Sequence, residues 1–139
     1  MVGELDLDTL LTAMRPTLLE GEFVFCSVPG MGYRDLEALQ PLACYREAEG
    51  LSLLLPRPAA DLHQLEYESV FRGITLAVHS SLDAVGFTAA VASKLAALDI
   101  PANVIAAFYH DHVFVPLEQE KHGLLLPWRR TSELGLSWV

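Results

Sequence analysis

The 139-residue chain has few basic residues, few cysteines and no long apolar run. Nine Lys and Arg stand against eighteen Asp and Glu, which gives a net charge of -9 at pH 7. Because phosphate backbones and anionic lipids repel such a chain, we expect neither nucleic acid nor a membrane as a partner. No apolar stretch reaches the ~18 residues that span a bilayer. The first residues are acidic where a signal peptide would be basic, so we expect a cytoplasmic protein.

The only two cysteines, Cys26 and Cys44, each lie in an apolar run and lack the CxxC spacing. Nothing in the sequence indicates secretion, so we interpret both as reduced core residues. A disulfide stays open as an alternative if the strands that carry them pair with each other. A metal site would need further close ligands, and the sequence offers no obvious set. We therefore expect no metal and no cofactor.

Apolar residues make up 52% of the chain, enough for the core of one ordinary domain or of two very small ones. In the first half they recur at helical spacing and then in short β-branched and aromatic runs separated by Gly and Pro. We predict a helix over 6–14, a buried strand over 22–28, a polar loop or single helical turn over 31–41, a hairpin of strands 43–47 and 51–55, and a short helix over 59–64.

The second half has the clearest pattern, in the segment 74–116. An alternating strand leads through the turn 80–86 into an amphipathic helix that must pack against a sheet. The apolar stripe of this helix is formed by Phe87, Val91, Leu95 and Leu98. We predict a strand over 67–79, a helix ended by Asp99-Ile100-Pro101, strands over 104–109 and 112–115 joined at His110-Asp111-His112, and a further helix over 117–126.

The order strand, helix, strand, strand, helix describes most of a ferredoxin-like βαββαβ sandwich with an antiparallel sheet. We interpret the first half as a second, imperfect copy with exchanged edge elements. The prediction is an α+β protein with an N-terminal unit over 1–66, a C-terminal unit over 67–127 and an unassigned tail over 128–139. Because exposed sheet faces and edges usually pair symmetrically, we expect a homodimer or a higher homo-oligomer.

The turn before the second-half helix is the main candidate site. A helix N-terminus leaves its first four N–H groups unpaired and carries about half a positive charge, so it can hold a carboxylate. The amides of Val85, Gly86 and Phe87 would take that carboxylate, while Asp83 or Asn103 would lie near an ammonium group. The alternatives are an ordinary capped helix start and an Asn103 that serves a nearby loop amide. The candidate ligand-binding residues are Ser81, Leu82, Asp83, Val85, Gly86, Phe87, Asn103 and Val104.

A second constellation consists of His79, His110, Asp111 and His112. In a ferredoxin-like sheet the strand ending at His79 lies beside the strand beginning at His112, so the rings could approach one point and bind a metal in a hydrolase or lyase. A structural hydrogen-bonding role is the alternative that we favour. A nucleophilic serine is disfavoured because no Gly-x-Ser-x-Gly elbow is present. We therefore assign no catalytic residue.

Two stretches give the chain a family resemblance. Val85-Gly86-Phe87-Thr88-Ala89-Ala90 opens the helix, and Leu98-Asp99-Ile100-Pro101-Ala102-Asn103-Val104-Ile105 leads into the next strand. Both are similar to the ACT domain, the small amino-acid-binding regulatory module of aspartokinases and other enzymes of amino-acid metabolism. Phe25–Pro29, Arg46–Leu51, Val78–Leu82 and Ala107–His112 further resemble a group of small stand-alone bacterial proteins with two ACT-like units and no attached enzyme.

The resemblance implies two ferredoxin-like ACT units that bind an amino acid or a related carboxylate and have no catalytic activity of their own. The rival interpretations are the metal-assisted enzyme and a purely structural interaction module. Two positions depart from the family pattern. Val85 replaces a proline that often precedes the turn glycine. Asp99 stands where many members have the helix-ending glycine, so we expect a left-handed cap there to be strained or absent.

Overall fold

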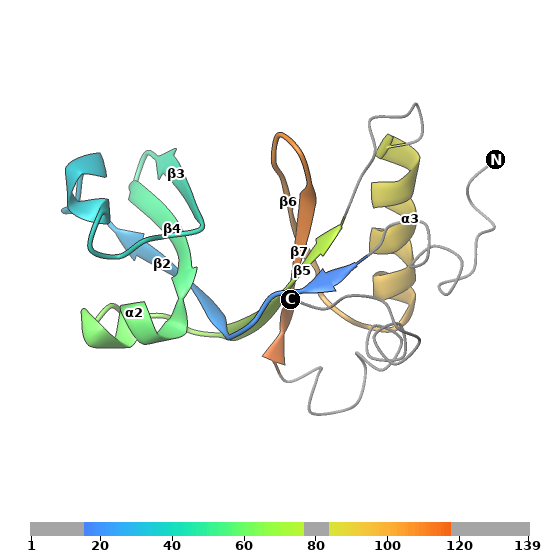
Figure 1. Ribbon diagram of the computed structural model, residues 1–139, viewed down its shortest axis with the longest axis horizontal. Coiled ribbons are helices and arrows are strands. Elements are labelled where there is room, and N and C mark those ends of the chain that lie inside the picture. Colours follow the sequence, from blue (N-terminus) through green and yellow to red (C-terminus); the bar gives the residue numbers. More distant parts are fainter. Residues whose placement is uncertain (1–15, 77–83, 118–139) are drawn as a thin grey trace. The chain divides into compact units, whose positions relative to one another are not determined.

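The computed structural model describes residues 16–76 and 84–117, whose elements are drawn in Figure 1. Their contacts divide the chain into two compact units. The central unit comprises residues 21–71, and the described part of the flanking unit comprises residues 16–20, 72–76 and 84–117. Each contains antiparallel strands and at least one helix, so the predicted α+β class is confirmed.

Several predicted elements belong to segments that the structure does not describe. The predicted helix over 6–14, nearly all of the one over 117–126, the turn residues 80–83 and the tail over 128–139 lie outside the described residues. Within the described ranges, no helix is both long enough and apolar enough to cross a lipid bilayer.

The central unit is built on strands in the spatial order β3-β4-β2-β5, with antiparallel neighbours throughout. Its elements are β2 (Phe23–Val28), the 3₁₀ turn η1 (Tyr33–Leu36), β3 (Ala43–Glu47), β4 (Gly50–Pro56), α2 (Arg57–Leu62) and the start of β5 (Val70–Leu76). The first and third strands lie in the centre, as in a ferredoxin-like βαββαβ unit. The predicted strand and hairpin are thus confirmed. Helix α2 begins two residues earlier than predicted, because proline is accepted in the first turn of a helix.

One face of this sheet carries the core of the central unit. Alternate residues of β2 and β4 point to it, and α2 contacts both strands. The buried residues are Val24, Cys26, Val28, Leu39, Leu51, Leu53, Leu55 and Ala60. On the opposite face, Phe25 of β2 and Phe71 of β5 pack edge to face with ring centroids 5.2 Å apart. This second face is more exposed than the first. On β2, Ser27 points to it and is open to solvent, whereas Cys26 and Val28 on either side of Ser27 are buried.

The two cysteines are free thiols. Cys26 of β2 and Cys44 of β3 both pair with Leu53, so β4 lies between them. Two strand spacings put their backbones about 9.5 Å apart, beyond the reach of a disulfide. The prediction of reduced cysteines is confirmed, and burial raises the pKa of the Cys26 thiol.

Gly50, the residue that closes the β3–β4 hairpin, occupies a position that only glycine fits. Its φ of +134° lies in a region that L side chains rarely adopt, and an added Cβ would stand 2.5 Å from the Cα of Pro29. The glycine that predicted the hairpin is therefore also what allows β4 to start against the Val28–Gly30 turn.

The flanking unit has its strands in the order β1-β5-β7-β6. Its elements are β1 (Thr17–Leu18), the end of β5, α3 (Ala84–Ala97), β6 (Asn103–Ala106) and β7 (Asp111–Pro116). The short β1 pairs antiparallel with β5 and takes the position that the fourth strand of a ferredoxin-like unit would occupy. A residue pair from the N-terminal part of the chain thus completes this sheet, which is the predicted exchange of an edge element.

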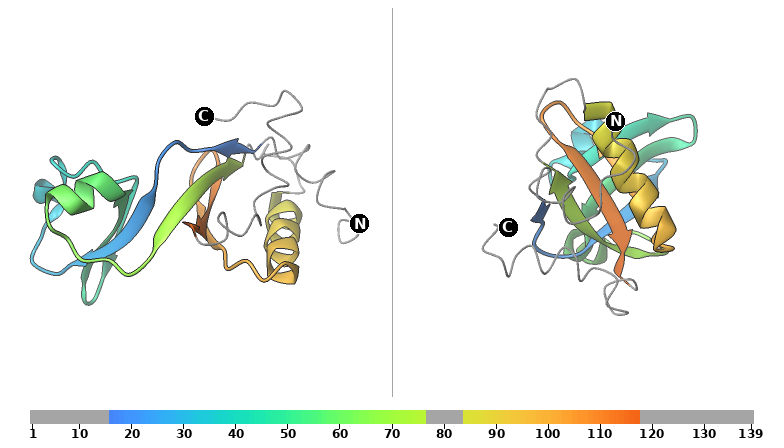
Figure 2. Two further views of the ribbon diagram at one scale, coloured as in Figure 1. Left: turned by 90° about the horizontal axis from the view of Figure 1, so that it is seen from below. Right: turned by 90° about the vertical axis from the view of Figure 1, so that its right-hand side faces the viewer.

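Helix α3 lies along one face of the flanking sheet (Figure 2). Val91 and Leu95 are buried as predicted, but Leu98 is 41% exposed and follows the end of the helix. The buried residue at this end is Ile100 instead. The inclusion of Leu98 in the stripe was wrong because the helix stops at Ala97, so the 3.6-residue period no longer applies there.

The cap of α3 is formed even though the glycine is missing. Asp99 adopts φ +61°. The Asp99 amide donates to the carbonyl of Ala96 at 3.0 Å, and the Ile100 amide donates to that of Leu95 at 2.9 Å. These two bonds define a Schellman motif, in which aspartate is one of the few residues that tolerates the left-handed position. Of the two alternatives expected here, a strained or an absent left-handed cap, the absent one is excluded, and Asp99 occupies the left-handed position that glycine would adopt more easily.

The β6–β7 turn lies earlier than predicted. The Ala107 amide donates to the carbonyl of His110 at 3.0 Å, which closes a turn over residues 107–110. Asp111 and His112 then belong to β7, so the predicted junction at His110-Asp111-His112 was wrong. Phe108 and Tyr109 were predicted in a strand. They pack edge to face on each other at the tip and are 91% and 76% exposed.

Candidate functional site

The predicted anion site is the N-terminal turn of α3. The helix begins at Ala84, so Val85, Gly86 and Phe87 are its second to fourth residues. The amides of Val85 and Gly86 are among the four N–H groups that a helix leaves without an intrahelical partner, and the Phe87 amide follows them directly. The backbone of these residues is described, whereas Ser81, Leu82 and Asp83 lie outside the described residues.

Asn103 and Val104 follow the opposite end of the same helix. From Gly86 to Ala97 the helix rises about 16 Å at 1.5 Å per residue, and β6 starts only after the cap at Asp99. The Asn103 amide group donates to the carbonyl of Phe114 on β7 at 3.4 Å, and Val104 is 38% exposed. Within one chain, the structure therefore does not bring these two residues to the amides at Gly86.

The histidine constellation is only partly assembled in the described residues. His112 on β7 shares a hydrogen bond of 2.9 Å between its Nδ1 and the hydroxyl of Thr75 on β5. Burial lowers the pKa of His112, and the nearby charge of His110 lowers it further, while Asp111 opposes both. The rings of His110 and His112 are 6.4 Å apart, and His79 lies outside the described ranges. Among the described residues no three His, Cys, Asp or Glu are grouped closely enough to hold a metal.

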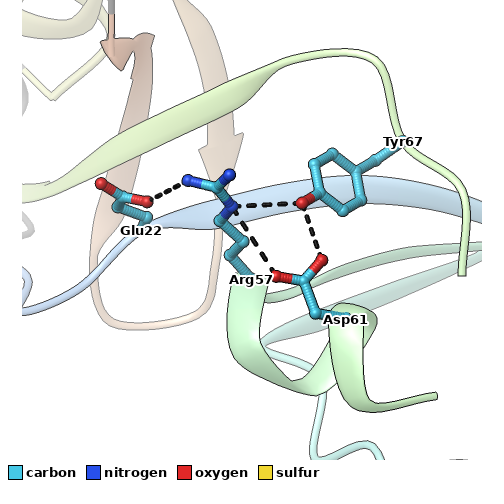
Figure 3. Close-up of polar contacts among 4 residues, drawn as sticks. All are labelled: Glu22, Arg57, Asp61 and Tyr67. Atoms are coloured by element: carbon cyan, nitrogen blue, oxygen red, sulfur yellow. Dashed lines mark hydrogen bonds and ion pairs between the residues drawn. The ribbon is translucent and has the colours of Figure 1, made fainter. Parts of the chain in front are cut away.

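A network of polar contacts in the central unit centres on Arg57, the first residue of α2 (Figure 3). Its Nη1 contacts Oε1 of Glu22 at 2.8 Å, and its Nε donates to the Tyr67 hydroxyl at 3.1 Å. The Tyr67 hydroxyl donates to Oδ1 of Asp61 at 2.8 Å, and Oδ2 of Asp61 lies 3.9 Å from the Arg57 Nε. The bonds to Glu22 and then Tyr67 raise the pKa of Arg57 above its usual range. The network fixes the segment after α2 to the residue before β2.

The same segment forms one side of an open hollow in the central unit. The hollow has a cavity volume of about 610 Å³. Among the described residues, it is lined by Phe25, Ser27, Glu66, Tyr67, Glu68, Ser69 and Phe71. Phe25 and Ser27 come from β2, and the others come from the approach to β5 and from β5 itself, which pairs with β2.

Sequence reasoning missed this hollow. The two sets of lining residues lie about forty positions apart, and they meet only because Phe23 pairs with Phe71 and Val24 with Val70. A signal was present in the run Glu66-Tyr67-Glu68, where an aromatic residue stands between two acids shortly before a strand.

Comparison with solved structures finds 17 similar chains, and two of them are described below. A crystal structure of a protein of unknown function from Vibrio cholerae, described as a possible transport protein, is 50% identical, with 83% of this chain and 87% of that chain covered and a TM-score of 0.72. A crystal structure of a protein from Agobacterium tumefaciens is 15% identical, covers 89% of this chain and 90% of that chain, and has a TM-score of 0.64. This second likeness concerns the fold alone. None of the curated proteins compared with the chain matches it.

Two family models match the chain in tandem. Each is described as an ACT domain, one over residues 2–72 and the other over residues 68–122. Both carry the ferredoxin-like fold that the strand orders of the central and flanking units display. ACT domains are generally regulatory modules that bind small ligands. The division of the chain at residue 66 stays a prediction. The chain belongs to the ACT domain family, with two such domains in tandem.

Proposed function

We propose that this protein is a regulatory module that binds an amino acid or a related small carboxylate and has no catalytic activity of its own. The observation that supports it most is the match of an ACT domain over residues 68–122, which includes the strand, helix and two strands around Gly86. Occupancy of the site would be transmitted to a partner protein, as expected for a regulatory module.

The backbone at the start of α3 supports a carboxylate as the group that is recognised. The helix has fourteen residues, long enough for its aligned peptide dipoles to place about half a positive charge at the first turn. Gly86 is its third residue, and a residue without Cβ lets a ligand approach the main chain closely. In this proposal the amides of Val85, Gly86 and Phe87 bind the carboxylate, and Ser81, Leu82 and Asp83 flank it, with Asp83 near the ammonium group.

Asn103 and Val104 enter the proposal from a second copy of the chain. They follow the far end of α3 from Gly86, so one chain alone leaves them away from its own ligand. A symmetric dimer repeats each surface on both partners and can place the start of β6 of one copy against the helix start of the other. The ligand then lies at an interface between subunits of a homodimer.

The first test is a thermal-shift screen of the twenty amino acids against the whole chain. A ligand present at one hundred times its Kd stabilises the native state by about 2.7 kcal/mol, which raises the melting temperature by several degrees. A screen in which no amino acid changes the melting temperature contradicts the proposal.

A variant then locates the site. Gly86→Leu is expected to abolish the ligand-induced shift, because the added side chain occupies the space over the amides. Ala96→Leu is the matched control, since Ala96 is exposed near the far end of the same helix. The control should keep the full shift. A Gly86→Leu variant that responds like the control would place the ligand elsewhere.

A further inference from the structure

We propose that the hollow of the central unit binds an organic cation, an ammonium group attached to a flat apolar body. This site is separate from the carboxylate site proposed at α3, because all of its described lining residues belong to residues 21–71. Its volume of about 610 Å³ is within the range of small-molecule sites. Its recognition chemistry is also opposite, with acids and aromatic rings in place of backbone amides.

The apolar part of the site is an aromatic pair. Phe25 and Phe71 come from the paired strands β2 and β5, and their rings stand at 89° to each other with centroids 5.2 Å apart. Both residues are only partly buried, so ring surface is left for a ligand. The faces of aromatic rings carry negative potential and attract ammonium groups within about 6 Å.

The charged part of the site consists of Glu66 and Glu68. Both are exposed and line the hollow, and none of its described lining residues is basic. The Arg57 guanidinium that contacts Tyr67 is already engaged by Glu22 and Asp61. Among the described lining residues, an ammonium group would therefore meet two carboxylates without a competing cation, whereas a ligand carboxylate would be repelled.

The site is organised before a ligand arrives. The Tyr67 hydroxyl accepts a hydrogen bond from Arg57 and donates one to Asp61 (Figure 3). These two bonds hold the end of the Tyr67 side chain, and Tyr67 stands between Glu66 and Glu68 in the sequence. Ser69 and Phe71 follow directly as β5 joins β2. Fixing the lining residues in advance reduces the conformational entropy that binding must remove.

Titration of the whole chain with benzylamine tests the proposal, followed by the amide and aromatic NMR signals. Benzylamine should shift signals of Phe25, Ser27 and residues 66–71 in a saturable way and bind more weakly at high salt. Benzyl alcohol, of nearly the same shape without the charge, should bind at least about tenfold more weakly, and benzoate should leave these signals unchanged. Equal binding of the amine and the alcohol, or benzylamine shifts confined to other residues, would overturn the proposal.

Matched variants separate this site from the general attraction of a chain with net charge -9. The pair E66Q/E68Q should weaken benzylamine binding about tenfold or more. The pair E47Q/E49Q removes the same charge from the exposed β3–β4 hairpin of the same unit and should leave the affinity within about twofold. Ser27→Lys, at an exposed lining position, should also abolish binding. An equal effect of the two glutamine pairs would refute the proposal, and neither result bears on the amides at Gly86.

Discussion

At the scale of single residues, His112 shows how position changes a side chain's chemistry. The sequence indicated a histidine next to an acid near a turn. In the fold that residue is half-buried on β7, and its Nδ1 shares a hydrogen bond with Thr75 of the neighbouring strand. The structural role that we favoured over metal binding agrees with this bond. The neutral imidazole is the form that the surroundings favour.

The lowered pKa of His112 makes stability depend on pH. The unfolded chain takes up the proton near the ordinary histidine pKa of about 6.5, and the folded chain takes it up only at lower pH. Above that value the contribution is fully present, and it is lost as the pH falls through the folded-state pKa. Urea unfolding of His112→Asn from pH 8 to pH 5 should therefore give a flatter curve than the parent chain. His63→Asn, at an exposed position in the central unit, should keep the parent slope. Identical slopes for both variants would contradict this assignment.

At the scale of elements, hairpins and caps depend on a few backbone positions. Asp99 replaces a glycine and still ends α3 with both bonds of a Schellman motif. Asp99 can be tolerated because its short polar side chain lowers the cost of the left-handed conformation. At Gly50 the requirement for glycine is stricter. Its positive φ disfavours any L side chain, and the close Pro29 backbone leaves no room for a Cβ.

Gly50→Ala should destabilise the central unit strongly. The methyl group would meet the Pro29 backbone at 2.5 Å in a conformation that alanine rarely adopts. We expect a loss of about 2 kcal/mol or more in the free energy of unfolding, measured by urea denaturation. Gly30→Ala is the control, because an added Cβ there has nothing within 4 Å and the φ of Gly30 is not positive. Its effect should stay within about 0.5 kcal/mol. Similar losses for the two variants would show that Gly50 is not under special constraint.

At the scale of the whole molecule, the chain carries two ACT domains in tandem. Strand β1 precedes the central unit in the sequence but belongs to the sheet of the flanking unit. Strand β5 serves both units, since Val70 and Phe71 pair with β2 while Ile74 and Thr75 pair with β1. The proposed ligand site needs groups from both ends of α3: the amides near Gly86 at its start, and Asn103 and Val104, which follow its end. A second subunit is the simplest source of the missing end.

Mixed dimers test that arrangement and rest on the proposed function. Gly86→Leu and Asn103→Ala should each abolish the ligand-induced thermal shift on their own. If the two variants are unfolded and refolded together, half of the dimers are mixed, and each mixed dimer has one site built from two unaltered surfaces. About one quarter of all sites should then bind ligand, as counted by calorimetry. No recovery after mixing, with both variants folded, would exclude a site shared between subunits.

Much of the fold could be predicted from local patterns. The β-branched and aromatic run over 22–28, the glycine between the two runs of the hairpin and the period of α3 all predicted elements that are present. The errors occurred where local patterns compete, as at Phe108 and Tyr109, whose strand propensity was outweighed by a turn that closes between Ala107 and His110. The same holds for Leu98, which continues the period of the helix but lies beyond its cap.

The sequence by itself determined where most of the described helices and strands lie and that Gly86 stands where a helix begins, because both follow from spacing and from the conformational range of single residues. The tertiary structure alone decided that β1 completes the sheet of the flanking unit, that β4 separates the two cysteines, and that Phe25 and Ser27 share a hollow with residues 66–71. These outcomes depend on pairing between distant segments. Strand register and loop closure set that pairing, and neither leaves a local signature in the sequence.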